Sequence, residues 1–436
     1  MMMKRYRRSV ALLAALTVAA GGCNLDLNDP NFPPEEVVFS DPEGLKAVAV
    51  GLQAEYANQI VDPIYVVGLV TDELGAGAST FANFQAAEAG RELDPATDVS
   101  EGPFRGHYRV IKLANDLLTA VPDARMAEGT KSGIIALSRL IKAMALGHLI
   151  MLYEQIPLDV GINNPAPTFV DRQTVLSEIL RLLQEARTQI NTTPVSTEFT
   201  SDVLAPGFNL ENTINAMLAR YSLVAGDYTQ AIEAAQRVDL SVRSEFRFSA
   251  NDPNSIFQLM YRSGNAFQLR PRQSFRQQAE AGDRRVAFWV TPANVSGAAG
   301  PLDELRQYRA LDAPFPVYIA DEMRLIMAEA YARLGNLEPA RTLVNAVRTQ
   351  CPPAGVDPIE PMPCLPPLSA AELPTQQAVL NEILQQRRYE LFLQGVRFED
   401  LRRFGQPLKY EFIPYPTSEC ERNPNTPRGA QPWQCR

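Results

Sequence analysis

Apolar residues recur every three or four positions along most of the chain, the spacing that places them on one face of an α-helix. Residues 41–60, 106–121 and 171–190 show this pattern clearly, and residues 133–158 are apolar almost all the way round. A helix that is apolar all the way round is expected to lie buried among other helices. Patterns typical of strands are short and rare, as at residues 315–319. The fold is therefore predicted to be mostly α, a helical scaffold joined by long loops.

Two segments, residues 215–238 and 325–348, share a tetratricopeptide-like helix-turn-helix pattern. Each contains a Gly-Asp or Gly-Asn turn, in which Gly226 or Gly335 can adopt the positive φ that a tight turn requires. The two copies lie too far apart in sequence for tandem repeats of ~34 residues. Each copy predicts a tetratricopeptide-like pair of antiparallel helices. A generic helical hairpin is the alternative.

Residues 241–316, between these pairs, lose helical periodicity and are rich in Phe, Arg, Asn, Pro and Gly. A long irregular insertion in a helical scaffold is usually functional or disordered. The aromatic residues of this loop-rich insertion favour an ordered structure. No change in composition and no Gly/Ser-rich linker divides the chain, so residues 23–436 are interpreted as one structural unit.

The N-terminus has the architecture of a secretory signal. Four basic residues precede an apolar run at residues 10–20, which is shorter than the ~20 residues that span a bilayer. Small residues follow and then Cys23, an arrangement that resembles the lipobox of bacterial lipoproteins. Residues 1–22 are predicted to be a signal peptide and Cys23 to be lipidated, so that the chain is held to a membrane through its lipid alone. A soluble secreted protein with an unmodified cysteine is the alternative.

The four remaining cysteines, Cys351, Cys364, Cys420 and Cys435, suit an exported protein with disulfides. Four cysteines allow three pairings. The local pairs are favoured, because residues 351–364 and 420–435 both form proline-rich loops of similar length. Metal binding is a poor alternative, since the spacing fits no zinc pattern.

Composition and charge limit the possible partners and chemistry. The formal net charge is −9 and the pI about 5.1, which argues against nucleic acid or an anionic membrane surface as a partner. The only two histidines, His107 and His148, lie in helical patterns, so histidine-based catalysis and His-rich metal sites are not expected. Asp72 and Glu73 are adjacent and point in different directions, unlike the paired carboxylates of a glycosidase. We expect no catalytic residues, no metal and no cofactor.

Residues 380–405, "LNEILQQRRYELFLQGVRFEDLRRFG", carry an unusual density of charge. This stretch resembles the C-terminal signature of the SusD/RagB family, and residues 316–336 resemble the helix that precedes it in that family. The residues that fit the C-terminal signature are Ile383, Arg387, Arg388, Glu390, Leu391, Gly395, Arg397, Asp400, Leu401 and Arg403.

The resemblance implies a surface lipoprotein that captures nutrients for a TonB-dependent transporter. It implies a lipid-anchored location at the cell surface of the outer membrane, a SusC-like barrel as partner, and a small glycan or peptide as ligand. It also implies that the protein is not an enzyme. Two other classes stay open: a secreted carboxylate-dependent hydrolase, and a tetratricopeptide-type scaffold for envelope proteins.

The charges of this C-terminal segment are interpreted as an internal brace. Arg387 and Glu390 lie three positions apart, so their side chains can meet on one helix face. We expect Gly395 to end the helix, and Arg397 and Asp400 to fold back and pair either with the helix or with loop carbonyls. The segment offers no Ser, Cys or His for catalysis.

Candidate ligand contacts are exposed aromatic residues with amide hydrogen-bond donors beside them, because such groups bind sugars and peptides. They gather in the segment "STFANF" and in the insertion, although each of them is also a plausible core residue. With only 2 tryptophans in the chain, the sequence does not decide between glycan and peptide. The candidates are Phe81, Asn83, Phe84, Asn265, Phe267 and Trp289.

Overall fold

The computed structural model of the chain describes residues 35–161, 163–262 and 268–436. The predicted signal peptide, Cys23, Asn265 and Phe267 lie outside the described residues.

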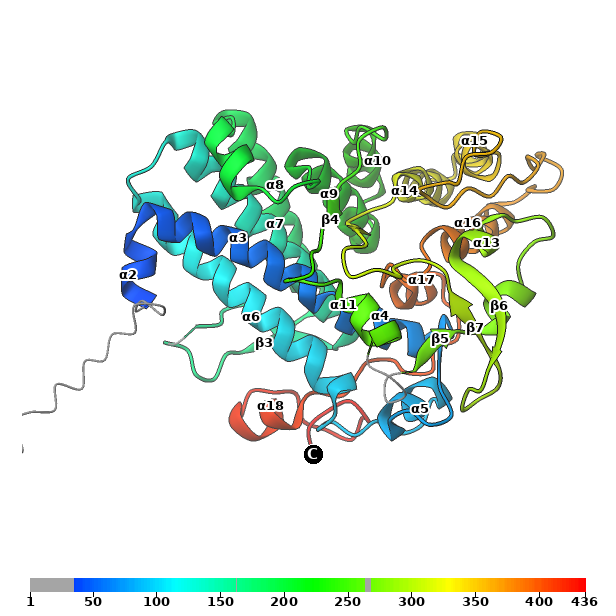
Figure 1. Cartoon of the computed structure of the whole chain (residues 1–436), viewed down its shortest axis with the longest axis horizontal. Coiled ribbons are helices and arrows are strands. Elements are labelled where there is room, and N and C mark those ends of the chain that lie inside the picture. The colour runs from blue at the N-terminus through cyan, green and yellow to red at the C-terminus, as the bar shows by residue number, and fades with distance from the viewer. Residues whose placement is uncertain (1–34, 162, 263–267) are drawn as a thin grey trace, which may run out of the picture.

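The main helices pack side by side, mostly in chain order, into a row that runs across the molecule (Figure 1). Helix α3 packs on α6, α6 on α7, α7 on α8 and α8 on α9, and the row continues through α10 to α14, α15 and α16. The predicted helical scaffold is confirmed. Its members are α3 (Pro42–Gln59), α6 (Asp98–Ala120), α7 (Glu128–Leu152), α8 (Arg172–Thr192), α9 (Leu210–Ala225), α10 (Tyr228–Gln236), α14 (Ala320–Arg333), α15 (Leu337–Arg348) and α16 (Gln376–Glu390).

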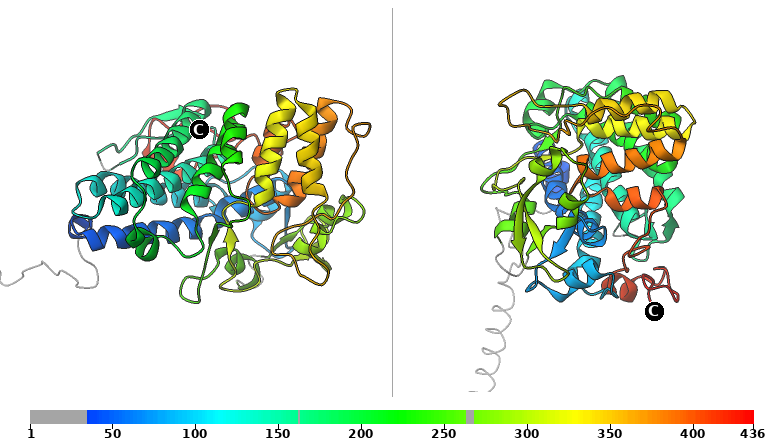
Figure 2. Two further views of the ribbon diagram at one scale, coloured as in Figure 1. Left: turned by 90° about the horizontal axis from the view of Figure 1, so that it is seen from above. Right: turned by 90° about the vertical axis from the view of Figure 1, so that its right-hand side faces the viewer.

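Shorter helices occupy the ends and the loops of the row. Viewed from above, the row forms a layer with the loop-rich segments along one side (Figure 2). The shorter helices are α2 (Glu35–Ser40), α4 (Val61–Val70), α5 (Ala82–Ala89), η1 (Val121–Asp123), η2 (Phe199–Val203), α11 (Ser255–Phe257), η3 (Gln258–Arg262), α12 (Gln273–Gln277), α13 (Arg285–Trp289), α17 (Arg397–Arg403) and α18 (Thr417–Arg422).

The two predicted hairpins are α9–α10 and α14–α15. Gly226 and Gly335 adopt the expected positive φ, 83° and 82°, in the turns between the helices. Helix α10 packs directly on α14, so the two hairpins are neighbours in space although residues 237–319 separate them in sequence. They stack like consecutive repeats because the intervening insertion loops out of the row.

The insertion is ordered over its described residues, as its aromatic residues predicted. It contains α11 to α13 and most of the short strands, which form two-stranded antiparallel sheets. The pairs are β1 (Leu74–Ala76) with β5 (Leu269–Pro271), β2 (Gln155–Pro157) with β3 (Phe169–Asp171), β4 (Glu245–Phe246) with β8 (Phe315–Pro316), and β6 (Val290–Val295) with β7 (Leu302–Leu305).

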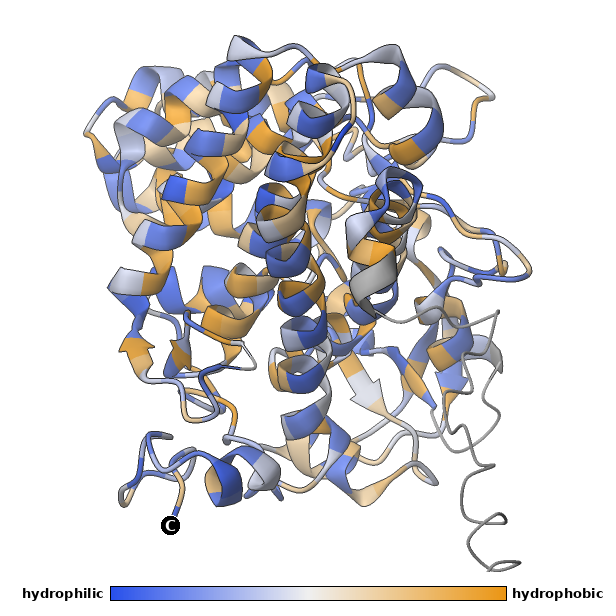
Figure 3. Cartoon of the chain, turned by 90° about the vertical axis from the view of Figure 1, so that its left-hand side faces the viewer, coloured by the Kyte–Doolittle hydropathy of each residue, from blue (hydrophilic) through white to orange (hydrophobic). Residues whose placement is uncertain are grey.

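Most helices carry apolar residues on one side and polar residues on the other, visible as stripes in Figure 3. Helix α7 differs, because it is long and apolar enough by composition to cross a membrane. In this fold, however, 78% of the most apolar stretch of α7 is buried against other parts of the protein. The sequence-based expectation of a buried central helix is confirmed.

The charged C-terminal segment forms a buried brace between α14, α16 and α17. Arg387 donates two hydrogen bonds of 2.9 Å to Asp400. Arg403 donates to Asp400 at 3.0 Å and to Glu329 on α14 at 2.8 Å. Every one of these side chains is less than a tenth exposed. The interpretation of this segment as structural fits the geometry.

Two details of the predicted brace are wrong. Arg387 does not pair with Glu390, which accepts from Arg285 at 3.2 Å instead, because Glu390 faces the insertion and Arg387 faces α17. Helix α16 ends at Glu390, before Gly395, which adopts a φ of 71° in the loop that leads to α17.

Both disulfides are the predicted local ones, Cys351–Cys364 and Cys420–Cys435.

The two histidines form a pair in the interior between α6 and α7. Nδ1 of His107 lies 2.9 Å from the carbonyl oxygen of Pro103, and its Nε2 lies 2.9 Å from Nδ1 of His148. A carbonyl can only accept, so Nδ1 of His107 donates to it and Nε2 accepts from His148. Burial lowers the pKa of His107 to about 4, which keeps this ring neutral.

We expect this pair to destabilise the fold in acid. Between about pH 6.5, the ordinary pKa of an imidazole, and pH about 4, the unfolded chain binds a proton that folded His107 excludes. The free energy of unfolding should therefore fall as the pH decreases through this window. Urea unfolding at several pH values should show wild type losing about 3 kcal/mol more than His107→Asn. Equal losses of unfolding free energy in wild type and His107→Asn would contradict a neutral, buried His107.

Candidate functional site

The predicted aromatic contacts differ sharply in exposure. Phe81 precedes the first turn of α5 and is 46% exposed, and Asn83 in that turn is partly exposed. Phe84, one position further along the helix, is 2% exposed and packs against Tyr65. The helical turn directs Phe84 into the core and leaves Phe81 at the surface, so Phe84 offers no face to a ligand.

Trp289 also lies in the core. Its ring is 1% exposed and contacts Phe288 and Phe392. Its indole N–H donates to the carbonyl oxygen of Tyr389 at 2.8 Å, which satisfies the one polar group of the ring. The expected role of Trp289 as an exposed stacking platform does not agree with this position.

The two predicted segments do come together in space. Strand β1 pairs with β5, and the N–H of Gly77 donates to the carbonyl oxygen of Gln268 at 2.7 Å. The loop that carries Phe81 therefore lies beside Gln268 in the insertion. Phe81 and Asn83 stay ligand contacts predicted from the sequence alone, and the surface that they form is the alternative to the groove described next.

A surface groove lies at the other end of α5, where the helix ends at Gly90. We call it the C-terminal groove, and its volume is about 690 Å³. That volume falls within the range of small-molecule sites. Segments from opposite ends of the sequence form its walls: residues 90–93, 409–414 and 429–436.

Three partly exposed aromatic residues line this groove: Tyr410, Phe412 and Trp433. The Trp433 and Phe412 rings meet edge to face, with centroids 5.4 Å apart. The indole N–H of Trp433 donates to Oε2 of Glu154 at 3.0 Å, which fixes the orientation of the ring. Aromatic rings held in this way offer apolar faces beside polar groups.

Lys409 and Tyr410 attach the groove to the helices beneath it. The ammonium of Lys409 donates to Oδ1 of Asp72 at 2.8 Å and to the carbonyl oxygens of Leu69 and Glu88. The Tyr410 hydroxyl lies 2.6 Å from the carbonyl oxygen of Arg91. Burial raises the pKa of Tyr410 to about 12, so this hydroxyl remains a neutral donor.

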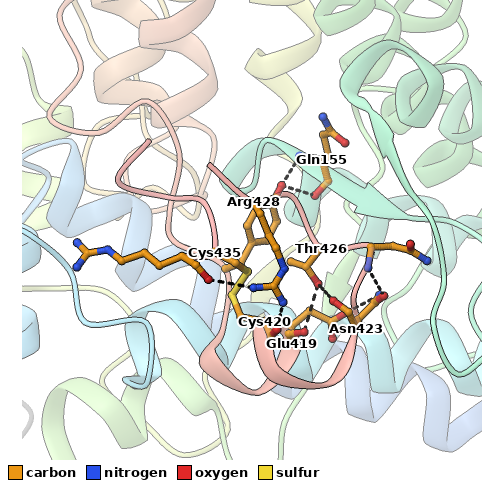
Figure 4. Close-up of a disulfide and its surroundings, with 10 residues drawn as sticks. Gln155, Glu419, Cys420, Asn423, Thr426, Arg428 and Cys435 are labelled. Atoms are coloured by element: carbon orange, nitrogen blue, oxygen red, sulfur yellow. Dashed lines mark hydrogen bonds between the residues drawn. A yellow bond between two sulfur atoms is a disulfide. The ribbon is translucent and has the colours of Figure 1, made fainter. Parts of the chain in front are cut away.

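The Cys420–Cys435 disulfide closes the loop that carries Trp433 (Figure 4). Within this loop Arg428 donates to the carbonyl oxygens of Cys420 and Arg436, at 2.5 and 3.0 Å. The N–H of Cys435 donates to the carbonyl oxygen of Pro427 at 3.0 Å. These bonds hold the loop in one conformation, so a ligand need not order it on binding.

The groove has polar groups of both signs at its edges. Arg91, Glu411 and Gln431 line it, and Arg436 forms an exposed ion pair with Glu92 at 2.9 Å. Amide, carboxylate and guanidinium groups next to aromatic faces suit a ligand with many hydroxyls and apolar C–H faces, such as a sugar. Among the described residues, no group of three or more His, Cys, Asp and Glu side chains could hold a metal ion.

The sequence pointed to Trp289 and not to Trp433. Trp433 has no aromatic neighbour in sequence, and its partner Phe412 comes from a distant position. The sequence feature that could have identified Trp433 as a ligand contact was its place in a predicted disulfide loop, two residues before Cys435.

Comparison with known proteins gives a family match in the C-terminal part of the chain. The model of the SusD family matches residues 306–428, a range that includes α14 to α17 and the buried brace. The same fold is found in solved structures of this superfamily. A SusD superfamily protein from Bacteroides fragilis has 17% identity and a TM-score of 0.69, with 89% of this chain and 99% of that chain covered.

Residues 306–428 are similar to the SusD family, and the chain shares its fold with a solved SusD superfamily protein. A SusD-like carbohydrate binding protein from Bacteroides vulgatus has 16% identity and a TM-score of 0.66, with 84% of each chain covered. A laminarin binding SusD-like protein has 18% identity and a TM-score of 0.63, with 84% of this chain and 92% of that chain covered. No curated protein sequence matches this chain. The family match ends before Trp433, so it does not include the whole C-terminal groove.

Proposed function

We propose that this chain is a cell-surface lipoprotein that binds a glycan and delivers it to a TonB-dependent outer-membrane transporter. The observation that carries the proposal is the C-terminal groove, in which Trp433, Phe412 and Tyr410 stand beside polar groups of both signs. Two structures of the same fold, the carbohydrate binding protein and the laminarin binding protein, support a glycan as the ligand class.

The groove binds its ligand without changing it. Glu92 is paired with Arg436, and Trp433 and Gln434 both donate to Glu154, so these two carboxylates have structural partners. Calorimetric titration of the purified protein with neutral oligosaccharides should give saturable binding, and chromatography should recover the sugars intact. Binding of peptides alone, or release of shorter sugars, would overturn the proposal in favour of peptide capture or of a carboxylate-dependent hydrolase.

Lipidation at Cys23 would supply the membrane anchor. We expect labelled palmitate to enter the wild-type protein in a bacterial host and to be absent from Cys23→Ser, because only the thiol at position 23 can carry the lipid. The disulfide cysteines are the internal control, since they remain in both proteins. Equal labelling of the two proteins would rule out this anchor.

Transfer of the ligand requires a pore, because a protein bound to the membrane through lipid cannot cross it. We therefore expect extraction in mild detergent, followed by affinity purification from the native host, to recover a SusC-like β-barrel together with this chain. The Cys23→Ser protein, which should not reach the membrane, is the matched control. Repeated recovery of wild-type protein alone would argue against uptake and for a scaffolding role.

A further inference from the structure

A second surface groove lies between α6, β2 and α18. We call it the α6–α18 groove, and its volume is about 470 Å³, within the range of small-molecule sites. Residues at the start of the Cys420–Cys435 loop line this groove, and residues at the end of the same loop line the C-terminal groove. One disulfide-closed loop therefore contributes to both grooves. The walls of the α6–α18 groove include Glu101, Phe104, Arg105, Tyr108, Glu419 and Arg422.

One aromatic ring is held in a fixed position at the wall of this groove. Tyr108 is partly exposed, and its hydroxyl donates to the carbonyl oxygen of Pro157 at 2.9 Å. The ring also packs against the buried ring of Phe104, with centroids 4.7 Å apart. These contacts fix the Tyr108 ring and leave part of its surface open, as stacking on a sugar requires.

The α18 wall of the groove is also fixed. The side-chain amide of Asn423, a residue that is 2% exposed, donates to the carbonyl oxygen of Pro167 at 3.0 Å and to Oε1 of Glu419 at 2.9 Å. Asn425 donates to the carbonyl oxygen of Ala166 at 2.8 Å. The groove is therefore formed before a ligand arrives, which lowers the entropic cost of binding.

The charges of the groove balance. Arg109 lies 3.7 Å from Glu55, and Lys112 lies 2.7 Å from Asp116. The remaining charged residues that line the groove are two bases and two acids, Arg105, Arg422, Glu101 and Glu419. Within the described part of the chain, the side chains of Arg105, Arg422 and Glu101 make no hydrogen bond and no ion pair. Free donors and acceptors without an excess of charge suit a neutral ligand with many hydroxyls.

We propose that the α6–α18 groove is a second site for a neutral saccharide. This rests on the proposed function, because the ligand class is that of the C-terminal groove. The fixed ring of Tyr108 supplies the apolar face, and Arg105, Arg422 and Glu101 supply groups that hydrogen-bond to hydroxyls. Tyr108 is the one partly exposed aromatic residue among the described residues of this groove, against three in the C-terminal groove. The saccharide therefore binds more weakly here.

Calorimetric titration with neutral trisaccharides of glucose, galactose, mannose and xylose tests the proposal. We expect two sites per chain, the second about tenfold weaker than the first. Trp433→Ala should keep the weaker site at unchanged affinity. If the wild type binds none of these sugars, the proposed function fails together with the second site. If the wild type binds at one site and Trp433→Ala abolishes all binding, the second site alone is wrong.

Tyr108→Ala is the informative variant, because it removes the apolar face of the α6–α18 groove. We expect it to lose the weaker site and to keep the tighter one. Tyr228→Ala is the matched control, since Tyr228 is a partly exposed tyrosine on α10 that lines neither groove. It should keep both sites. Retention of both sites by Tyr108→Ala would overturn the proposal.

Two further measurements decide the matter if Tyr108→Ala does not fold. The double variant Arg105→Ala, Arg422→Ala removes two exposed side chains and should weaken the second site alone, whereas Arg125→Ala, at an exposed arginine outside both grooves, should not. Crystals of the wild type soaked in the best-binding trisaccharide should show it against the Tyr108 ring. An unchanged second site in the double variant, or a sugar in the C-terminal groove alone, would overturn the proposal.

Discussion

Replacing Arg387 by alanine is expected to lower the free energy of unfolding by about 3–5 kcal/mol, the usual cost of breaking a buried ion pair by removing one partner. Arg387 and Asp400 are 2% and 1% exposed, and two hydrogen bonds join them. Without Arg387, Asp400 keeps the ion pair with Arg403, which is shared with Glu329. Urea unfolding at neutral pH measures the loss directly.

Arg388→Ala is the control for this prediction, because Arg388 is the next residue of α16 and donates to Gln278 at the surface. Its removal should change the free energy of unfolding by less than about 1 kcal/mol, as is usual for exposed polar contacts. Glycan affinity should be the same in folded Arg387→Ala and in wild type. A variant of unchanged stability that no longer binds glycan would show that the segment is a ligand site and not a brace.

Replacing Trp433 by alanine is expected to weaken glycan binding by a factor of about 30 or more, which corresponds to about 2 kcal/mol. Trp433 supplies the largest ring of the C-terminal groove, and its bond to Glu154 and the disulfide loop fix the ring before the ligand arrives. Calorimetric titration of the best-binding oligosaccharide gives the affinity. The melting temperature should change little, because Trp433 is partly exposed and its loop stays closed by the Cys420–Cys435 disulfide.

Phe81→Ala separates the two candidate surfaces. Phe81 and the groove lie at opposite ends of α5, so a small ligand in the groove does not reach Phe81. We expect Phe81→Ala to bind as wild type does. Normal binding by Trp433→Ala together with loss of binding by Phe81→Ala would place the ligand on the surface predicted from the sequence, and the C-terminal groove would be the wrong site.

Much of the scaffold could be predicted from sequence because it depends on local patterns. Helical periodicity identified α3, α6, α7 and α8, and the turn glycines identified both hairpins. The disulfides were predictable because each closes a short loop. The density of charge in residues 380–405 indicated a brace, since this segment lacks the residue types of a catalytic site.

The pairings within the brace required the tertiary structure. Residues three apart on a helix can meet, yet Arg387 binds Asp400 across a loop and Glu390 binds Arg285 from the insertion. A buried charge takes the partner that the packing of the helices brings closest. Spacing along one helix does not contain that information.

The sequence by itself determined the helical scaffold, the two local disulfides and the family resemblance, because periodicity, spacing and short motifs are local properties of the chain. Only the tertiary structure decided which aromatic residues are exposed: Phe84 and Trp289 lie in the core, whereas Trp433 faces a groove. That groove brings residues 90–93 against residues 409–436. Its walls are more than three hundred residues apart in sequence, and they meet because Lys409 and Tyr410 bind the backbone around α5.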